Sequence, residues 1–199
     1  MPTAYIRPYQ RTASGPISSI TGSILTVIMP PLSLQPEKPP VPARVPVVST
    51  VGPVPRRLRN LIRRAVTSTL AAEGATGRVR VEVAITDDET IRRLKARYLG
   101  IDEATDVLSF PAGEWPGRGR TSFRDLGQVV IARPFVERQA SAAGRPFEEE
   151  LVFLVVHGVL HLLGYRDDEP EGLEEMRRRG TLLTEQVLRT SAQDGGGRP

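Results

Sequence analysis

Residues 157–168 read HGVLHLLGYRDD, and this stretch holds both histidines of the 199-residue chain. His157 and His161 are four residues apart, so on a helix they share one face, with Cβ atoms about 5–6 Å apart. Gly164 can adopt the left-handed conformation that ends a helix and turns the chain back. We therefore expect Asp167 to return toward the two imidazoles.

Two imidazoles and one carboxylate are a ligand set of catalytic zinc sites, in which water takes the fourth position. We predict one zinc ion per chain, bound by His157, His161 and Asp167, although Asp168 and Glu169 are neighbouring alternatives for the third ligand. A bound water would attack an ester or a phosphodiester. The alternative, two buried core histidines, leaves polar rings uncompensated in an apolar run. Without cysteine, the chain can form no thiolate site or disulfide.

The chain outside this stretch divides into three regions. Residues 1–54 are rich in proline and poor in charge, and they predict a disordered leader. The apolar run Ile20–Met29 is too short to span a membrane and lacks a small-residue cleavage site, so we do not expect a signal peptide. Residues 55–190 predict a metal-dependent hydrolase domain, and residues 191–199 a disordered tail.

Hydrophobic periodicity predicts the elements of this domain. The predicted helices span residues 56–70, Asp87 or Asp88 to Tyr98, 134–143, 146–163 and 170–189, and the predicted strands span residues 79–85, 107–110 and 128–132. These elements predict one α/β (α+β-like) layer domain with about five helices. We expect the fourth of these helices and the turn after it to form a zincin-like metal site.

The charge of the chain is weakly informative. The formal charge is +4 and the pI about 9.9, and only Lys38 and Lys95 are lysines. A basic excess fits a nucleic-acid partner, but an arginine-rich composition explains it equally well. Arg118, Arg120 and Arg124 lie in a glycine-rich stretch that could grip backbone phosphates or form an ordinary surface loop.

Three motifs in order resemble signatures of one family. The histidine segment resembles the YbeY signature His-Gly-x-Leu-His-Leu-x-Gly-Tyr-Asp-His. Upstream, TDVLSFP at residues 105–111 resembles a second YbeY signature, and Leu126-Gly127 followed by Val129-Val130-Ile131 resembles a third, with Gln139-Ala140 fitting the helix after it. The resemblance covers roughly residues 56–190.

This resemblance implies an α/β fold with a small mixed sheet and a single zinc ion bound by three histidines. It also implies endonucleolytic cleavage of single-stranded RNA, in maturation of the 16S rRNA 3′ end and in ribosome quality control. The implied partners are rRNA and the small ribosomal subunit, in the cytoplasm, with no membrane or DNA partner expected.

Four positions depart from the family pattern. Asp167 stands where the family has its third histidine, and Arg166 stands before it, where the family usually has an aspartate. Where the family has an arginine that is thought to contact phosphate, this chain has Leu99. Where the family has an aspartate after the Leu-Gly pair, this chain has Gln128. Arg97 is the one candidate to replace the missing guanidinium, although a helix would point it elsewhere. No other catalytic group is assigned, and no substrate-binding residue.

Two alternative functions remain open. His157, His161 and Asp167 have the ligand spacing of metzincin-like proteases, but those enzymes need a glutamate directly after the first histidine, where this chain has Gly158. A catalytically impaired ribosome-binding module would fit the departures. Asp106 and Ser109 in the second signature are equally well explained as a turn residue and a strand residue.

Overall fold

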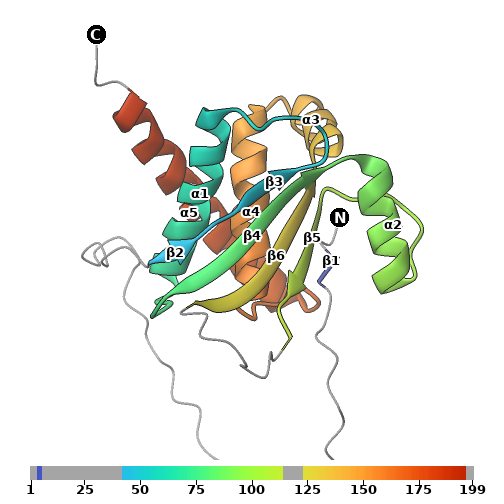
Figure 1. Ribbon diagram of the computed structural model, residues 1–199, viewed down its shortest axis with the longest axis horizontal. Helices are drawn as coiled ribbons and strands as arrows, with labels where there is room; N and C mark the ends of the chain where they lie inside the picture. Colours follow the sequence, from blue (N-terminus) through green and yellow to red (C-terminus); the bar gives the residue numbers. More distant parts are fainter. Residues whose placement is uncertain (1–3, 6–41, 114–122, 196–199) are drawn as a thin grey trace, which may run out of the picture.

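The computed structural model describes residues 4–5, 42–113 and 123–195 (Figure 1). The helices are α1 (Arg56–Ala72), α2 (Asp88–Leu99), α3 (Arg133–Ala142), α4 (Phe147–Leu162) and α5 (Pro170–Gly195). The strands are β1 (Ala4–Tyr5), β2 (Ala43–Arg44), β3 (Val47–Ser49), β4 (Val79–Thr86), β5 (Val107–Pro111) and β6 (Arg124–Ala132).

The strands form one mixed sheet in the order β1-β5-β6-β4-β2. β3 also pairs directly with β4, further along that strand than β2 does. β4 is parallel to β6 and to both short strands on its outer side, whereas β5 is antiparallel to β6. The predicted α/β fold, a small mixed sheet packed with about five helices, is confirmed within the described ranges.

Helices cover both faces of the sheet unequally (Figure 1). α1, α4 and α5 pack together over one face, and alternate side chains of β4 point into this main core at Val79, Val81, Val83 and Ile85. α2 covers part of the other face, where Ile91, Leu108, Val130 and Ala132 form a second apolar cluster. Alternate side chains of the strands therefore pack into two separate apolar layers, one on each face of the sheet.

The position of α4 depends on Gly158. α4 lies against α1, α5 and the sheet, and most of its residues are buried. A Cβ atom at Gly158 would lie 2.6 Å from Cγ1 of Val129 on β6, which is far closer than van der Waals contact. On β5, Ser109 Oγ donates a hydrogen bond of 3.2 Å to the Gly158 carbonyl. The backbone of α4 thus packs directly against side chains of β5 and β6 here.

The predicted disordered leader is wrong at its C-terminal end. Within residues 42–54 the chain forms β2 and β3, and Val45 and Val54 are buried in the main core. Proline did not prevent this, because the carbonyls of Pro42 and Pro46 accept hydrogen bonds from Val79 and Val83 at the sheet edge. β1 also falls inside the predicted leader, and residues 6–41 lie outside the described part of the chain.

The other predicted helices and strands are confirmed, with two differences in length. β6 begins at Arg124 rather than residue 128. α5 continues through Gly195, so the predicted disordered tail is wrong over residues 191–195. Thr190 and Ser191 donate their hydroxyls to the carbonyls one turn back, which suits a helix that continues. Residues 196–199 lie outside the described part.

Among the described residues, no helix combines the length and the apolar character that crossing a bilayer requires.

Replacing Gly158 with alanine should separate α4 from β6. We expect the free energy of unfolding, measured by urea denaturation, to fall by about 1–3 kcal/mol from overpacking. Gly113→Ala is the matched control, because a Cβ there meets nothing within 4 Å. Adding Val129→Ala to Gly158→Ala should cost less than the sum of the two single changes; strict additivity would argue against the clash.

Candidate metal centre

α4 presents its two histidines on one face near its C-terminal end. Both side chains are buried, with 6% of His157 and none of His161 exposed. Their ring centroids are 4.7 Å apart and their planes nearly perpendicular. The ring of Phe153, one turn earlier, stacks on His157 at 5.9 Å. The spacing of four residues therefore produces the shared face that the sequence predicts.

The turn after α4 is built from hydrogen bonds that close the helix. The Gly164 amide donates to the His161 carbonyl, and the Tyr165 amide donates to the Leu160 carbonyl. This pair of bonds is the Schellman arrangement, which needs a residue with positive φ at its centre. Gly164 has φ 101°. The chain reverses here, as the sequence predicts.

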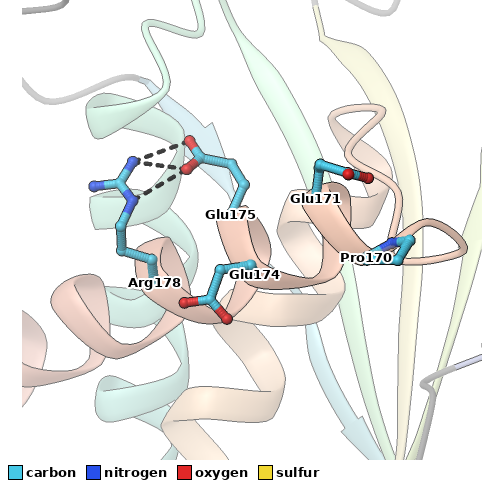
Figure 2. A pocket seen from close by; sticks show the side chains of 5 residues that line it. All are labelled: Pro170, Glu171, Glu174, Glu175 and Arg178. Carbon is cyan, nitrogen blue, oxygen red and sulfur yellow. Dashed lines mark hydrogen bonds and ion pairs between the residues drawn. The ribbon is translucent and has the colours of Figure 1, made fainter.

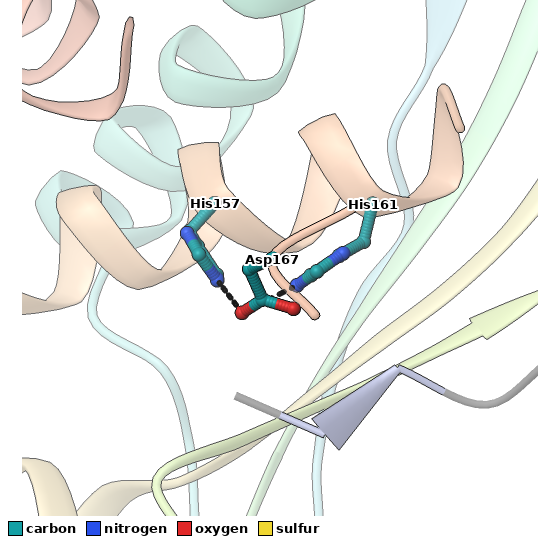
Figure 3. A group of neighbouring side chains, drawn as sticks. All are labelled: His157, His161 and Asp167. Atoms are coloured by element: carbon teal, nitrogen blue, oxygen red, sulfur yellow. Dashed lines mark ion pairs between the residues drawn. The ribbon is translucent and has the colours of Figure 1, made fainter. Parts of the chain in front are cut away.

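The reversal brings Asp167 back to the two imidazoles. Oδ2 of Asp167 lies 3.6 Å from Nε2 of His157 and 3.6 Å from Nε2 of His161 (Figure 3). One candidate ligand atom from each of the three residues lies within 4.8 Å of the others. The loop rests on α5, because a Cβ at Gly172 would lie 2.3 Å from the Arg166 carbonyl oxygen. The predicted cluster of His157, His161 and Asp167 is therefore present.

The cluster leaves buried polar atoms unsatisfied. Among the described residues, neither ring nitrogen of His157 has a hydrogen-bond partner. Oδ2 of Asp167 also has none there. A separation of 3.6 Å is too long for a good hydrogen bond. Buried polar atoms without partners are costly, unless something else satisfies them. A single cation between two nitrogens and one oxygen would do so, and this donor set suits zinc.

The electrostatics of the cluster favour an ionised carboxylate. Burial alone would raise the pKa of Asp167, but the two imidazoles outweigh burial and hold this pKa well below its ordinary value. His161 Nδ1 lies 3.1 Å from the Tyr165 carbonyl oxygen. When Nδ1 carries the proton and donates it to that carbonyl, Nε2 keeps its lone pair for a metal. Asp167 supplies negative charge at the same point.

A partly buried polar group behind the turn was not predicted. The Tyr165 hydroxyl donates to Glu73 at 2.6 Å, and Arg179 binds both oxygens of Glu73 at 2.9 and 3.1 Å. Burial, together with Glu73, raises the pKa of Tyr165 to about 12, so this phenol stays protonated at neutral pH. The three residues are far apart in sequence. Only the tyrosine in the histidine segment gave a signal.

Other residues considered from the sequence lie outside the cluster. The guanidinium of Arg97 lies over the neighbouring Tyr98 ring, 5.5 Å from its centroid. Asp106 accepts hydrogen bonds from the Val107 amide and the Thr105 hydroxyl, and Ser109 bonds to Gly158 as described, so both have structural contacts.

Most of the glycine-rich loop, residues 114–122, lies outside the described part of the chain. Arg118 and Arg120 lie outside the described residues, whereas Arg124 is exposed at the start of β6. The prediction that these arginines grip phosphates therefore stays a prediction.

A shallow hollow on α5 is separate from the histidine cluster. It is lined by Pro170, Glu171, Glu174, Glu175 and Arg178, and Glu175 pairs with Arg178 inside it (Figure 2). None of the three clustered side chains lines this hollow, so we do not assign it to the same site.

Gly158 also bears on the protease alternative. A Cβ atom on the residue after the first histidine would lie closer than normal contact distance to the side chains of Val129 and Ser109 on the sheet. A glutamate could not enter that space unless α4 moved away from the sheet. The carboxylate that a zincin-type protease uses as general base is absent, and its position is closed.

The chain is similar to proteins of one family. A family model described as Endoribonuclease YbeY matches residues 49–188. The Endoribonuclease YbeY of Moorella thermoacetica is 39% identical over 133 residues, which cover 64% of this chain and 85% of the relative. That of Brevibacillus brevis is 37% identical over 148 residues, 69% of this chain and 91% of the relative. With that of Persephonella marina the match is 44% identical over 93 residues, 47% of this chain and 60% of the relative.

A solved structure is also similar. The solution structure of TM1509 from Thermotoga maritima has a TM-score of 0.52 and 25% sequence identity, and the match covers 78% of this chain and all of that one. The family match includes α1, the sheet strands β4 to β6 and the clustered histidines. Together with the fold and the cluster at its centre, these similarities show that the chain belongs to the endoribonuclease YbeY family.

Proposed function

We propose that the protein is a zinc-dependent endoribonuclease that cleaves single-stranded RNA. It acts in the cytoplasm on rRNA of the small ribosomal subunit, in maturation of the 16S rRNA 3′ end and in ribosome quality control. The observation that carries this proposal is the convergence of His157, His161 and Asp167 on one point, where buried atoms of His157 and Asp167 lack partners among the described residues, inside a fold of this family.

In this proposal His157, His161 and Asp167 hold one zinc ion. When bound, zinc polarises a phosphoryl oxygen and lowers the pKa of water, so that hydrolysis can proceed near neutral pH. The chain's own residues supply the rest. Two imidazoles and an ionised carboxylate fix the ion, while the buried surroundings restrict water around it. Because Asp167 adds negative charge where a third imidazole would be neutral, the ion should acidify water less strongly.

A second candidate function is a ribosome-binding module without cleavage. Leu99 favours it, because its partly buried side chain packs against the second apolar cluster with Leu108 and Val130. That position therefore offers no guanidinium for a phosphate. Arg97, two residues earlier, is exposed, and its guanidinium lies over the Tyr98 ring.

The zinc content of the purified chain tests the site. We expect about one zinc ion per wild-type chain, and most of this zinc should be lost in His157→Ala and in His161→Ala because each removes a ligand. Elemental analysis measures the metal, and circular dichroism with thermal unfolding checks that each variant folds. Folded variants that retain a full equivalent of zinc would refute the assignment.

The third ligand is tested by a pair of adjacent acidic residues. Asp167→Ala should weaken zinc binding, whereas Asp168→Ala, one residue further along the same loop, should leave it nearly unchanged. Asp167→His should preserve or tighten binding, since it restores a third imidazole. The dissociation constant is measured by competition with a chromophoric chelator. A loss of affinity in Asp168→Ala alone would move the third ligand to that residue.

Parallel incubation with single-stranded rRNA and with casein separates the candidate functions. We expect cleavage of RNA only, abolished by EDTA and restored by added zinc. The control is His157→Ala, which should not cleave. Casein cleavage would indicate a protease, and retained zinc with neither substrate cleaved would indicate the binding module.

A further inference from the structure

We propose that Tyr165, Glu73 and Arg179 are positioning residues that fix the orientation of the His161 ring. This inference rests on the proposed function only in naming His161 as a metal ligand. It assigns a role to residues outside the ligand set, which lie at the end of α1, in the turn after α4 and on α5.

Tyr165 is held at three points, and each has a different partner. Its amide donates to the Leu160 carbonyl at 3.1 Å, which closes α4. Its carbonyl oxygen lies 3.1 Å from His161 Nδ1. Its hydroxyl donates to Glu73 at 2.6 Å. The carbonyl that orients the imidazole thus belongs to a residue whose backbone and side chain are both anchored.

The side-chain anchor is itself rigid. Glu73 follows the last residue of α1, and only 10% of its side chain is exposed. Arg179 on α5 binds both carboxylate oxygens of Glu73, bonds to Glu175, and lies over the Tyr165 ring at 5.2 Å. One nitrogen of this guanidinium, Nη1, reaches both Glu73 oxygens, and another, Nε, binds Glu175, so the planar group has few other geometries available. α1, α5 and the turn after α4 therefore meet in one fixed arrangement.

The consequence for His161 is a fixed ring orientation. With Nδ1–H donated to the Tyr165 carbonyl, Nε2 keeps its lone pair on the side where Asp167 lies, 3.6 Å away. If the carbonyl moved, the imidazole would lose the hydrogen bond that favours this tautomer and rotamer. Groups that hold a ligating histidine in this way are typically worth about 10–100-fold in metal affinity.

The same anchor also affects the third ligand. Asp167 comes two residues after Tyr165, and between them the Arg166 carbonyl packs against Gly172 of α5. The loop is therefore held at Tyr165 and again at Arg166 before the carboxylate reaches the cluster. Loosening the first of these points should disturb His161 first and Asp167 second.

The test compares Tyr165→Phe with wild type in the full chain, with Tyr98→Phe as matched control. Tyr165→Phe keeps the ring and the backbone but removes the bond to Glu73. Tyr98→Phe makes the same chemical change on α2, where Tyr98 is 49% exposed and its ring contacts Phe110. The dissociation constant for zinc is measured by chelator competition. We expect it to rise about 10–100-fold in Tyr165→Phe and to stay at the wild-type value in Tyr98→Phe.

A second measurement separates positioning from a general loss of stability. In the metal-free protein, ¹⁵N NMR of the imidazoles reports the tautomer, and the chain has only two histidines to assign. We expect wild-type His161 to be protonated on Nδ1, and Tyr165→Phe to show a mixture. If Tyr165→Phe fails to fold, Glu73→Gln replaces it, because the amide removes the carboxylate that Arg179 and Tyr165 share.

The outcomes distinguish this inference from the proposed function. A lower thermal unfolding temperature in Tyr165→Phe with unchanged zinc affinity and an unchanged tautomer would overturn the positioning role and leave the zinc site intact. Absence of zinc binding by the wild type would instead contradict the proposed function, while the metal-free tautomer would still test the positioning of His161.

Discussion

The close approach of α4 to the sheet at Gly158 is the constraint on which the rest of the structure depends. It lets a mostly buried helix rest directly on β5 and β6, with the Ser109 hydroxyl bonded to the helix backbone. With the sheet-facing side so fixed, the neighbouring face of the helix directs His157 and His161 toward the returning loop. The geometry of the cluster thus depends on the absence of a side chain at Gly158 as well as on the ligands themselves.

Much of the fold and the three clustered residues could be predicted from the sequence, because both depend on local periodicity. A helical stripe, an alternating strand, and a spacing of four residues before a glycine are visible in one dimension. The strands β2 and β3 are not, because their short edge pairing depends on β4 and prolines mask it. The contacts among Glu73, Tyr165 and Arg179 could not be predicted either, since no periodicity links charges that only tertiary packing brings together.

Two departures from the family pattern have local explanations in the fold. Leu99 packs against the second apolar cluster, where a charged group would lose hydration. The Gln128 side chain donates to Glu82, which also pairs with Arg80. An aspartate at position 128 would place a second negative charge against Glu82. Each departure therefore fits the residues around it in this fold.

The order of the residues along the chain has a consequence for biosynthesis. All three clustered side chains lie within residues 157–167, yet the group that braces the turn needs Glu73, made early, and Arg179, made late. A nascent chain that stopped just beyond Asp167 would carry every ligand but not the guanidinium that locks Tyr165. In the proposed arrangement, the turn that carries the Tyr165 carbonyl is therefore fixed only after α5 has been made, later than all three ligands.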